Sequence, residues 1–443
     1  MATTYLSRTN SGSGTGDKIF TYSFWIKRTK VDAEHCIAAA GTGQREFIRF
    51  EATGELTYRR TSGSAFRFTT LRKFTDVGAW YNIVFNIDSR LGSGGDRILL
   101  FVNGVSETAV SAATDMGQNY TPKIGAAELQ TIGKDSEQAN PYFDGVMSDI
   151  HFIDGVRYNA SYFGSTDSTT GEWKINTSPN VTYGTNGFAI LKNGNTITDQ
   201  SPNSNNFSLA SGAVTNTNDC PDNNFATLNS LDNFYTSTAL SHGSTTLVGG
   251  NSHAQNNATI ALTKGKWYWE TKTNDWQGSN ASAIGISSEG ATATNYEFYN
   301  QNGNNVGYGY YSNGSVYGNG GTPASGYGSA SGTHIIGVAL DLDNNKIAWS
   351  YDGTFQGSAN PATGANMIAI TDPSALRTGF YFPAFKNQSG NKTLNVNFGN
   401  GFFGTTAITT NSGNGYAGKE GKSKFNYSVP TNYSAISTKG LNI

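Results

Sequence analysis

The sequence has little charge and almost no cysteine. Charged residues make up 14% of the 443 residues, whereas about 25% is usual. The formal net charge of -2 provides no basic surface for nucleic acid. Cys36 and Cys220 are the two cysteines, and they are too few and too far apart for a disulfide framework. We therefore expect two buried free thiols and no nucleic-acid partner.

Long apolar runs are also missing. No stretch approaches the ~18 apolar residues that a membrane-spanning helix requires. The first residues, "MATTYLSRTN", lack the apolar segment of a signal peptide. We expect neither membrane insertion nor a secretion signal.

Sequence motifs for catalysis and zinc binding are absent. The sequence has no G-x-S-x-G motif of a serine nucleophile, and none of its histidines has the spacing of a zinc-ligand pair. The five histidines are His35, His151, His242, His253 and His334. We interpret each as an isolated histidine of a loop or strand, and we expect no zinc site.

Glycine and aromatic residues are abundant instead. The chain has 54 glycines, and aromatic residues reach 12%, a share that argues against disorder. The segments "DRILLFVNGVSE" (96–107) and "NNKIAWSYDGTF" (344–355) place Asn-Gly or Asp-Gly between two apolar runs. Such a pattern predicts a tight β-hairpin. The composition as a whole is typical of an all-β protein with many loops.

Residues 1–171 contain the signals of a β-sandwich. The segments "YSFWIKR" (22–28), "WYNIVFNID" (80–88) and "PYFDGVMSDIHFIDGVRY" (141–158) predict strands between turns, which favours a sandwich or jelly roll. Their order around the "FVNGV" hairpin resembles the laminin-G/concanavalin-like family. The matching residues are Trp80, Asn103, Gly104, Phe143, Gly145, Asp149 and Phe152.

Residues 172–235 are rich in Asn, Gly, Ser and Thr, and their apolar residues are too sparse for a domain. We expect a structured, irregular connector that packs on its neighbours. The segment resembles an element of marine bacteriophage structural proteins that joins one β-sandwich to the next. The matching residues are Tyr183, Gly184, Asn186, Gly187, Phe188, Asp199, Ser201, Asn206, Phe207, Pro221 and the run 223–229.

Residues 236–443 predict a second set of strands. They include "GKWYWETKT" (265–273), "SAIGISS" (282–288) and the paired unit "HIIGVALDLDNNKIAWSYDG" (334–353). Their order resembles the SPRY/B30.2 domain. The matching residues are Gly265, Lys266, Trp267, Tyr268, Glu270, Gly285, Gly337, Asp341, Asp343, Trp349, Asp352, Gly353, Pro383, Phe398 and Gly399. We expect an all-β chain of two jelly-roll-type β-sandwich domains, concanavalin-like and then SPRY-like, with an irregular connector.

Two carboxylates of the second domain have a spacing that would suit a glycosidase. Asp341 and Asp343 nevertheless lie in "DLDNNK", where Asp and Asn are typical turn residues. Asp352 extends the same stretch to an EF-hand-like count, but Lys346 occupies the position of the required glycine. We therefore expect a turn there, no EF-hand and no enzyme.

Calcium stays open in the first domain, and we expect no other cofactor. Some laminin-G-like domains bind calcium through loop carboxylates and carbonyls. Asp144 and Asp149 are the candidates that this resemblance implies, although both also fit plain turn and strand-end positions.

Aromatic and amide residues in polar loops are the candidate ligand-binding residues. They are Trp276, Tyr311, Asn313 and Tyr317. Tyrosine combines a flat apolar face with a hydroxyl, which suits sugars and protein surfaces. Tyr308 and Tyr310 alternate with glycine, so we expect them in the core of a strand. A core position is also the open alternative for Trp276, Tyr311 and Asn313.

The resemblance to phage proteins implies a virion protein that is made in the host cytoplasm. We expect a tail-fibre or head-fibre adhesin that binds host surface polysaccharide, contacts other virion proteins and forms a homo-oligomer such as a trimer. The alternative is a capsid decoration or tail-adaptor protein, because the chain enters its first strand region by Tyr5 without a docking domain or shaft. A glycan depolymerase would lack its pair of carboxylates.

Overall fold

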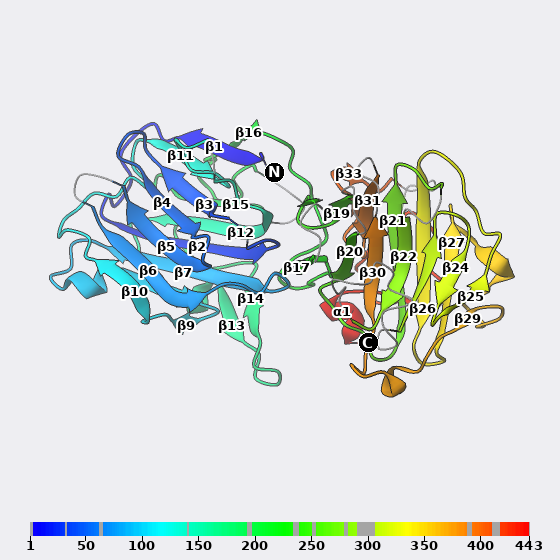
Figure 1. Ribbon diagram of the computed structural model, residues 1–443. Helices are drawn as coiled ribbons and strands as arrows, with labels where there is room; N and C mark the ends of the chain where they lie inside the picture. The colour runs from blue at the N-terminus through cyan, green and yellow to red at the C-terminus, as the bar shows by residue number, and fades with distance from the viewer. Residues whose placement is uncertain are drawn as a thin grey trace. The chain divides into compact units, whose positions relative to one another are not determined.

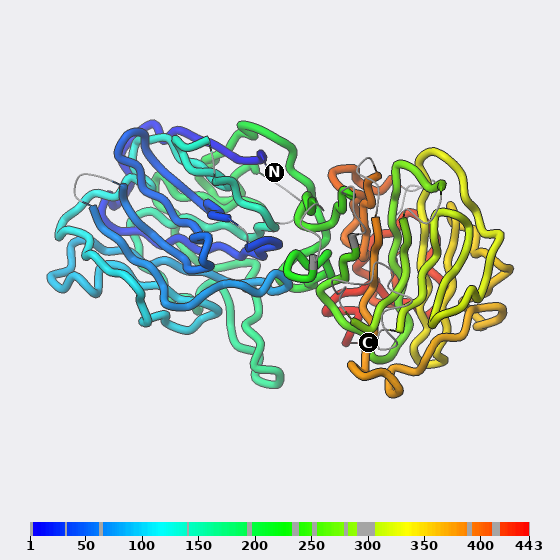
Figure 2. The backbone as a smooth tube through the Cα atoms, in the orientation of Figure 1, coloured from blue at the N-terminus to red at the C-terminus, as the bar shows by residue number. Residues whose placement is uncertain are grey.

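The structure, a computed structural model, divides into two compact units, Met1–Asn216 and Thr217–Ile443. The regular secondary structure of both units is almost entirely β-strand (Figure 1, Figure 2). The described residues are 3–31, 33–61, 65–139, 141–192, 197–233, 239–249, 254–278, 282–289, 306–387, 392–409 and 417–442. None of the helices within these ranges is long and apolar enough to cross a membrane.

The described residues of the first unit form two large antiparallel sheets and one small two-stranded sheet. The larger sheet has, in spatial order, β10 (Val110–Thr114), β6 (Arg67–Lys73), β5 (Glu55–Arg60), β4 (Glu46–Phe50), β3 (His35–Ala40), β11 (Leu129–Ile132), β1 (Tyr5–Thr9) and β16 (Ser208–Ser211). The smaller sheet has β15 (Phe188–Ile190), β12 (Gly145–Asp154), β2 (Ile19–Arg28), β7 (Trp80–Asp88), β8 (Ile98–Val102) and β9 (Val105–Ser106). The strands that the sequence predicts at 22–28, 80–88 and 141–158 are confirmed as β2, β7 and β12.

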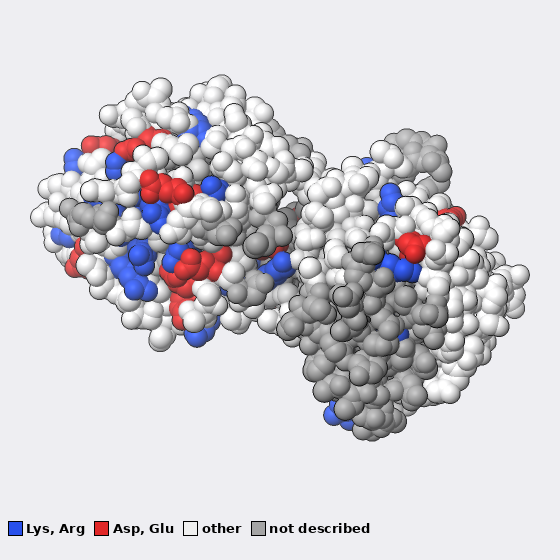
Figure 3. Space-filling view, turned by 45° about the horizontal axis from the view of Figure 1, so that its top comes forward, with Lys and Arg blue, Asp and Glu red and all other residues white. Residues whose placement is uncertain are grey.

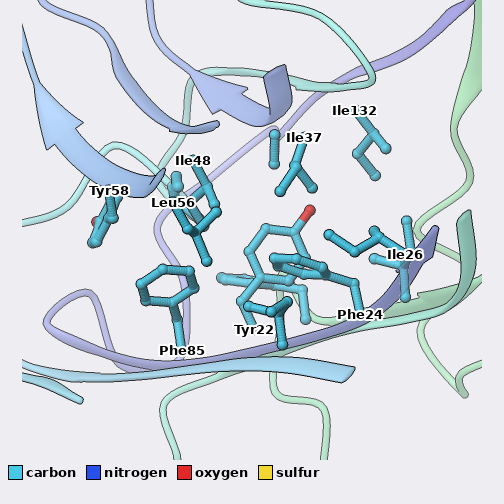
Figure 4. Packing of buried hydrophobic residues seen from close by; sticks show 14 of the residues in the cluster. Tyr22, Phe24, Ile26, Ile37, Ile48, Leu56, Tyr58, Phe85 and Ile132 are labelled. Atoms are coloured by element: carbon cyan, nitrogen blue, oxygen red, sulfur yellow. The ribbon is translucent and has the colours of Figure 1, made fainter. Parts of the chain in front are cut away.

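Alternate residues of facing strands fill the space between these two sheets (Figure 4). Tyr22, Phe24 and Ile26 of β2 are buried in this core, as their alternation predicts. Ile48 and Tyr58 approach them from the larger sheet. Burying a large apolar side chain contributes roughly 1.5–3 kcal/mol, so this layer holds the two sheets face to face.

Residues 155–187 cover the outer face of the smaller sheet. Phe163 packs there against Val84 and Ile153. Trp173, from the two-stranded sheet of β13 (Gly164–Thr166) and β14 (Trp173–Ile175), donates its Nε1–H to Asn82 Oδ1 at 3.1 Å. Both faces of β2 and β7 are consequently buried, and this face is closed to a ligand.

The two predicted hairpin turns are confirmed. Asn103 and Gly104 have φ of 48° and 78°, and Asp352 and Gly353 have φ of 48° and 83°, which are the positive values that such turns require. A Cβ at Gly104 would also lie 2.3 Å from the Trp173 ring. Each turn therefore needs its glycine, and in the first turn an aromatic ring packs directly on it.

The predicted connector has no core of its own over its described residues. β15 pairs with β12 and β16 pairs with β1, so the segment adds an edge strand to each sheet of the first unit (Figure 1). Phe188, Ile190 and Phe207 enter the core of that unit. The division between the two units falls after Asn216, so the expected connector is shared between them.

Asp199 accounts for the polar motif of this segment. Its carboxylate accepts the backbone N–H groups of Ala189 (2.8 Å), Ser201 (2.8 Å) and Asn205 (2.7 Å). Its own N–H donates to Asn206 Oδ1 at 2.9 Å. Because an irregular strand leaves backbone groups without ladder partners, these side-chain hydrogen bonds hold β15 and β16 in place.

The second unit is also built from two sheets over its described residues. The first has β17 (Leu228–Asn233), β20 (Ala254–Ala258), β30 (Phe382–Asn387), β22 (Ser282–Ser287), β23 (Gly307–Tyr311), β24 (Val316–Gly318) and β25 (Gly321–Ala324). The second has β18 (Ala239–Ser241), β19 (Thr246–Val248), β31 (Thr393–Asn397), β21 (Lys266–Thr273), β26 (His334–Asp341), β27 (Lys346–Tyr351) and β28 (Thr354–Phe355), with β29 (Ile368–Ala369) on β27 and β34 (Ser434–Ala435) on β21. β32 (Phe402–Phe403) and β33 (Thr406–Ala407) form a separate pair, and α1 (Thr438–Leu441) is a single helical turn.

The two ends of this unit cover the outer face of the sheet that contains β21. Phe225 from the first end and Phe425 and Tyr433 from the second pack on Tyr268 and Ala339. A bridge joins Phe225 to Ser437. The outer face of this sheet is therefore a second small core.

Glu270 lies fully buried under this cover. Its carboxylate accepts the N–H groups of Asn426 and Tyr427 at 2.8 Å each and the Tyr268 hydroxyl at 3.1 Å. Burial raises the pKa of Glu270 to about 7, although the hydrogen bonds act in the opposite direction. A titratable carboxylate thus fastens the C-terminal segment to β21.

The cysteines are both free thiols. Cys36 is buried, as expected, and burial holds its pKa well above the usual range. The expected burial of Cys220 is wrong, because its side chain is partly exposed in a short turn that a bridge to Asn223 closes.

Candidate functional site

Two of the four predicted ligand-binding residues belong to the core. Trp276 is 0% exposed and packs edge-to-face on Tyr310 with ring centroids 5.2 Å apart. Tyr311 is also 0% exposed, and the Lys386 Nζ lies 5.2 Å from its ring centroid. Of the exposed and core positions that the sequence left open for Trp276 and Tyr311, the structure has the core one. A bridge to Ala330 holds the polar loop of Trp276 against the sheet, and Tyr311 lies at the end of β23. The expected core positions of Tyr308 and Tyr310 are confirmed.

The other two residues lie together on the hairpin of β23 and β24. Asn313 is exposed and Tyr317 is partly exposed. The Asn313 Nδ2 donates to the Tyr317 hydroxyl at 3.2 Å, and the Asn313 Oδ1 accepts the Ser315 N–H at 2.9 Å. Their ligand-binding role stays a prediction.

The paired carboxylates of "DLDNNK" support a turn, as the sequence predicts. Asp341 accepts the Asn344 N–H at 3.1 Å and its Nδ2 at 2.8 Å, and it forms an ion pair with Lys266 at 2.9 Å. Asp343 accepts the Gly265 N–H at 2.8 Å. These contacts fit the turn role that the sequence predicts for both carboxylates.

The candidate calcium ligands have partners of their own. Asp144 forms an ion pair with Lys30 at 3.1 Å. Asp149 is buried in the left-handed backbone region, with φ of 46°, and accepts the Ser148 hydroxyl at 2.6 Å. Within the described ranges, no three His, Cys, Asp or Glu side chains gather in a way that could hold a metal ion.

Four histidines lie in the described part of the chain, and His253 lies outside it. His35 and His151 are buried. Burial lowers the pKa of His151 to about 3, and its Nδ1 lies 2.8 Å from the Tyr183 hydroxyl. His242 lies 3.0 Å from the Thr246 hydroxyl and has φ of 53°. These three histidines are structural, which leaves His334.

His334 belongs to a polar and aromatic cluster at the tip of the second hairpin. We define the Asp352 site by His334, Tyr351, Asp352 and Tyr427, which are all at least partly exposed. The His334 Nδ1 lies 2.7 Å from Asp352 Oδ2, and its ring stacks on Tyr351 with centroids 4.6 Å apart. Asp352 Oδ1 accepts the Ile335 N–H at 2.8 Å.

Glycines allow the tyrosine rings of this site to lie close to the backbone. A Cβ at Gly328 would lie 2.6 Å from the Tyr351 ring, and one at Gly353 would lie 2.5 Å from the Tyr427 ring. Burial and then the Asp352 charge raise the pKa of both tyrosines. Both hydroxyls therefore stay protonated, and the Tyr351 hydroxyl is buried without a hydrogen-bond partner among the described residues.

The Asp352 site is suited to binding and has no visible nucleophile. The His334 Nε2 lies 3.3 Å from the Ser331 carbonyl, and its Nδ1 faces Asp352. A carbonyl and a carboxylate only accept hydrogen bonds, so each imidazole nitrogen lies beside an acceptor. The Asp352 side chain is 39% exposed, and it can accept hydrogen bonds from the hydroxyls of a ligand.

The sequence reasoning missed this site although one signal was present. Tyr351 and Asp352 were visible at a predicted hairpin tip, but a turn role explained them fully. His334 lies at least 17 residues and Tyr427 at least 75 residues from these two positions in the chain. The pairing of β26 with β27 and the return of the C-terminal segment bring them together.

Two family models match separate parts of the chain. Residues 2–161 match the Concanavalin A-like lectin/glucanases superfamily, and residues 266–401 match the SPRY domain. The chain carries a concanavalin-like domain and an SPRY domain. The predicted fold class is confirmed, and both domain types support a binding role. A search of the curated proteins finds no match.

Several solved structures are similar to parts of the chain. The PSpry domain of TRIM65 is 16% identical and covers 39% of this chain and 89% of its own, with a TM-score of 0.28. The SPRY domain of human HERC1 is 14% identical over 38% of this chain and 96% of its own, with a TM-score of 0.27. Mouse laminin alpha1 domains LG4-5 are 10% identical over 87% of this chain and 78% of their own, with a TM-score of 0.27.

Proposed function

We propose that this protein is an adhesin of a bacteriophage virion, in a tail fibre or head fibre, and that it binds host cell-surface glycan without cleaving it. The observation that supports this most is the Asp352 site. It joins an exposed carboxylate, an imidazole and partly exposed tyrosine rings at the tip of a rigid hairpin. Sugars offer hydroxyls and flat apolar faces, which such groups bind.

The experiment is polysaccharide binding by the full chain on a glycan array. Asp352→Asn keeps an acceptor for the Ile335 N–H but removes the charge, and Tyr427→Ala removes a ring. We expect either variant to weaken binding about tenfold, since hydrogen bonds to charged groups and aromatic contacts contribute roughly 1.5–3 kcal/mol.

The matched controls lie in the first unit. Asp17→Asn removes an exposed carboxylate, and Tyr162→Ala removes a ring that is 41% exposed. Both should bind like the unchanged chain. Glycan binding that persists in Asp352→Asn and Tyr427→Ala would rule out this site, and hydrolysis of a bound glycan would rule out the non-enzymatic proposal.

A capsid decoration or tail-adaptor protein is the second candidate. The exposed edge strand β10, "VSAAT", favours it, because an uncharged edge offers unpaired backbone groups to another chain. Leu71 (62% exposed) and Val110 (38%) add exposed apolar side chains at this edge. In this case purified particles would contain the protein, yet glycan arrays would give no signal.

A further inference from the structure

The outer face of the larger sheet of the first unit carries an unusual array of arginines. Along β4 and β5, residues alternate between the core and this face. Ile48 and Tyr58 are in the core, so their neighbours Phe47, Arg49 and Arg59 are on the outer face. Figure 3 shows basic and acidic side chains beside one another on this unit.

Phe47 is the centre of the array. Its ring is 1% exposed, and guanidinium groups surround it. The distances from the ring centroid are 5.8 Å to Arg45, 4.6 Å to Arg49 and 5.4 Å to Arg59. These contacts hold three cations around one aromatic ring, so the guanidinium groups are positioned before any ligand arrives.

Acidic partners neutralise one side of the array. Arg45 forms ion pairs with Asp135 at 2.7 Å and Glu137 at 3.3 Å. Arg49 likewise has two, with Glu34 at 2.7 Å and Glu51 at 2.9 Å. Their charges are therefore satisfied within the protein.

The other side of the array has no such compensation. Arg59 and Arg67 lie directly opposite each other across β5 and β6. In the described part of the chain, neither has an acidic group within 4.0 Å, and Arg67 donates only to the Thr69 hydroxyl at 3.0 Å. Residues 62–64, which join the two strands outside the described ranges, are Ser, Gly and Ser, so they bring no acid.

This like-charge pair costs stability in the free protein. Like charges directly opposite in a sheet destabilise it. Burial is the main cause that lowers the pKa of Arg59, and Arg49 and Arg67 act in the same direction, whereas the more distant Glu51 and Glu34 oppose them. An anion between the two guanidinium groups would remove this repulsion. The arrangement in the free protein therefore favours the binding of an anion.

We propose that Arg59 and Arg67 bind the anionic groups of an acidic polysaccharide. Guanidinium groups bind carboxylate and sulfate oxygens through two parallel N–H donors. The two arginines lie on the outer sheet face beside Thr57, Thr69 and Thr114, so an extended chain can lie across the strands. The inference deepens the proposed glycan binding, on which it rests for the class of polymer, and adds its charge.

The test is binding of dextran sulfate and polygalacturonate to the full chain, with uncharged dextran as the reference. We expect both polyanions to bind more tightly at low salt than at high salt, since screening weakens exposed charge contacts. The double variant Arg59→Gln with Arg67→Gln should lose about tenfold or more in affinity. The midpoint temperature of its thermal unfolding should not fall, because the change removes the repulsion between the two arginines.

A matched control removes the same amount of charge elsewhere in this unit. Arg72→Gln with Arg90→Gln replaces two exposed arginines that pair with Glu107 and Asp88, and it should bind like the unchanged chain. Equal loss in both double variants would overturn the inference, because binding would then follow net charge alone. Undiminished binding in the Arg59 and Arg67 variant would overturn it as well.

The outcomes separate this inference from the proposed function. Asp352→Asn should leave dextran sulfate binding unchanged. If neutral glycans bind through the Asp352 site while neither polyanion binds, the anionic site is refuted and the adhesin proposal stands. If the polyanions bind through Arg59 and Arg67 while Asp352→Asn affects no glycan, the anionic site stands and the Asp352 site does not.

Discussion

Trp276 shows that the burial of a single residue cannot be predicted from its polar neighbours in the sequence. Its neighbours in "NDWQGSN" are polar, so local sequence favours a loop and an exposed ring. Its ring is nevertheless buried on Tyr310, which is 34 residues away in the chain. Burial here depends on a contact between distant segments, and sequence periodicity carries no record of such contacts.

Trp276→Ala should therefore destabilise the second unit and should not act as a binding mutation. We expect the free energy of unfolding to fall by about 3–5 kcal/mol, the usual cost of replacing a fully buried Trp by Ala. Urea unfolding followed by circular dichroism measures this loss. Tyr162→Ala, at a ring that is 41% exposed, should change the same quantity by less than about 0.5 kcal/mol. An unchanged midpoint for Trp276→Ala would contradict its position in the core.

Glu270 makes the second unit sensitive to pH. Its pKa in the folded state is about 7, above the ordinary value of 4.5, so the folded state binds a proton that the unfolded state releases. The stability contribution is present below about pH 4.5 and is lost as the pH rises through 7. We expect Glu270→Gln to abolish this loss.

The measurement compares urea unfolding of the unchanged chain and of Glu270→Gln at pH 5 and pH 8. The variant should be less stable at pH 5, because its amide nitrogen cannot accept the N–H of Asn426 or Tyr427. The difference between the two proteins should shrink by on the order of 2 kcal/mol at pH 8. A difference that stays constant or grows with pH would show that Glu270 is ionised throughout.

At the scale of elements, the local ones were predictable and the edges were not. A tight hairpin turn needs positive φ at two adjacent residues. Asn103 and Gly104 are residue types that adopt positive φ, so the sequence alone predicts this turn. Strand β21 is likewise readable from alternation, because side chains on a strand have period two. An edge strand such as β16 is short and polar, and only its partner β1 makes it a strand.

The exposed edge strand β10 is the place where we expect self-association. Val110 is 38% exposed at the start of this uncharged strand, and Val110→Lys should weaken edge-to-edge pairing, because a charge at an edge disfavours it. Sedimentation equilibrium measures the oligomer fraction. Leu209→Lys on β16, the opposite edge of the same sheet, is the matched control. If Leu209→Lys disrupted the oligomer and Val110→Lys did not, the interface would lie at β16 and the prediction for β10 would be wrong.

At the scale of the molecule, composition sets residues 172–235 apart from the first domain, whereas in the fold part of this segment belongs to the first unit. Residues 172–235 read as a connector because their apolar residues are sparse. Sparse apolar residues suffice when they complete an existing core, as Phe188 and Phe207 do with ring centroids 4.8 Å apart. The candidate Asp352 site could not be predicted from the sequence either, because its residues come from β26, β27 and the C-terminal segment, which only the fold brings together.

The fragment boundaries follow from this sharing. A fragment of residues 1–216 keeps β15, β16 and their three buried residues, Phe188, Ile190 and Phe207, whereas a fragment of residues 1–171 loses them. Burial of three such side chains contributes roughly 1.5–3 kcal/mol each, which is comparable to the whole stability of a domain, about 5–15 kcal/mol.

We therefore expect the fragment 1–216 to be soluble and to unfold in one cooperative urea transition. The fragment 1–171 should aggregate or show no cooperative transition, because it also leaves the edges of β12 and β1 unpaired. The stability of the longer fragment with Asp199→Ala should lie between those of the two fragments. The substitution removes the acceptor of three backbone N–H groups but keeps the apolar residues. If 1–171 unfolded at the same urea concentration as 1–216, the connector would contribute nothing to the first unit, and the boundary after residue 171 would be the physical one.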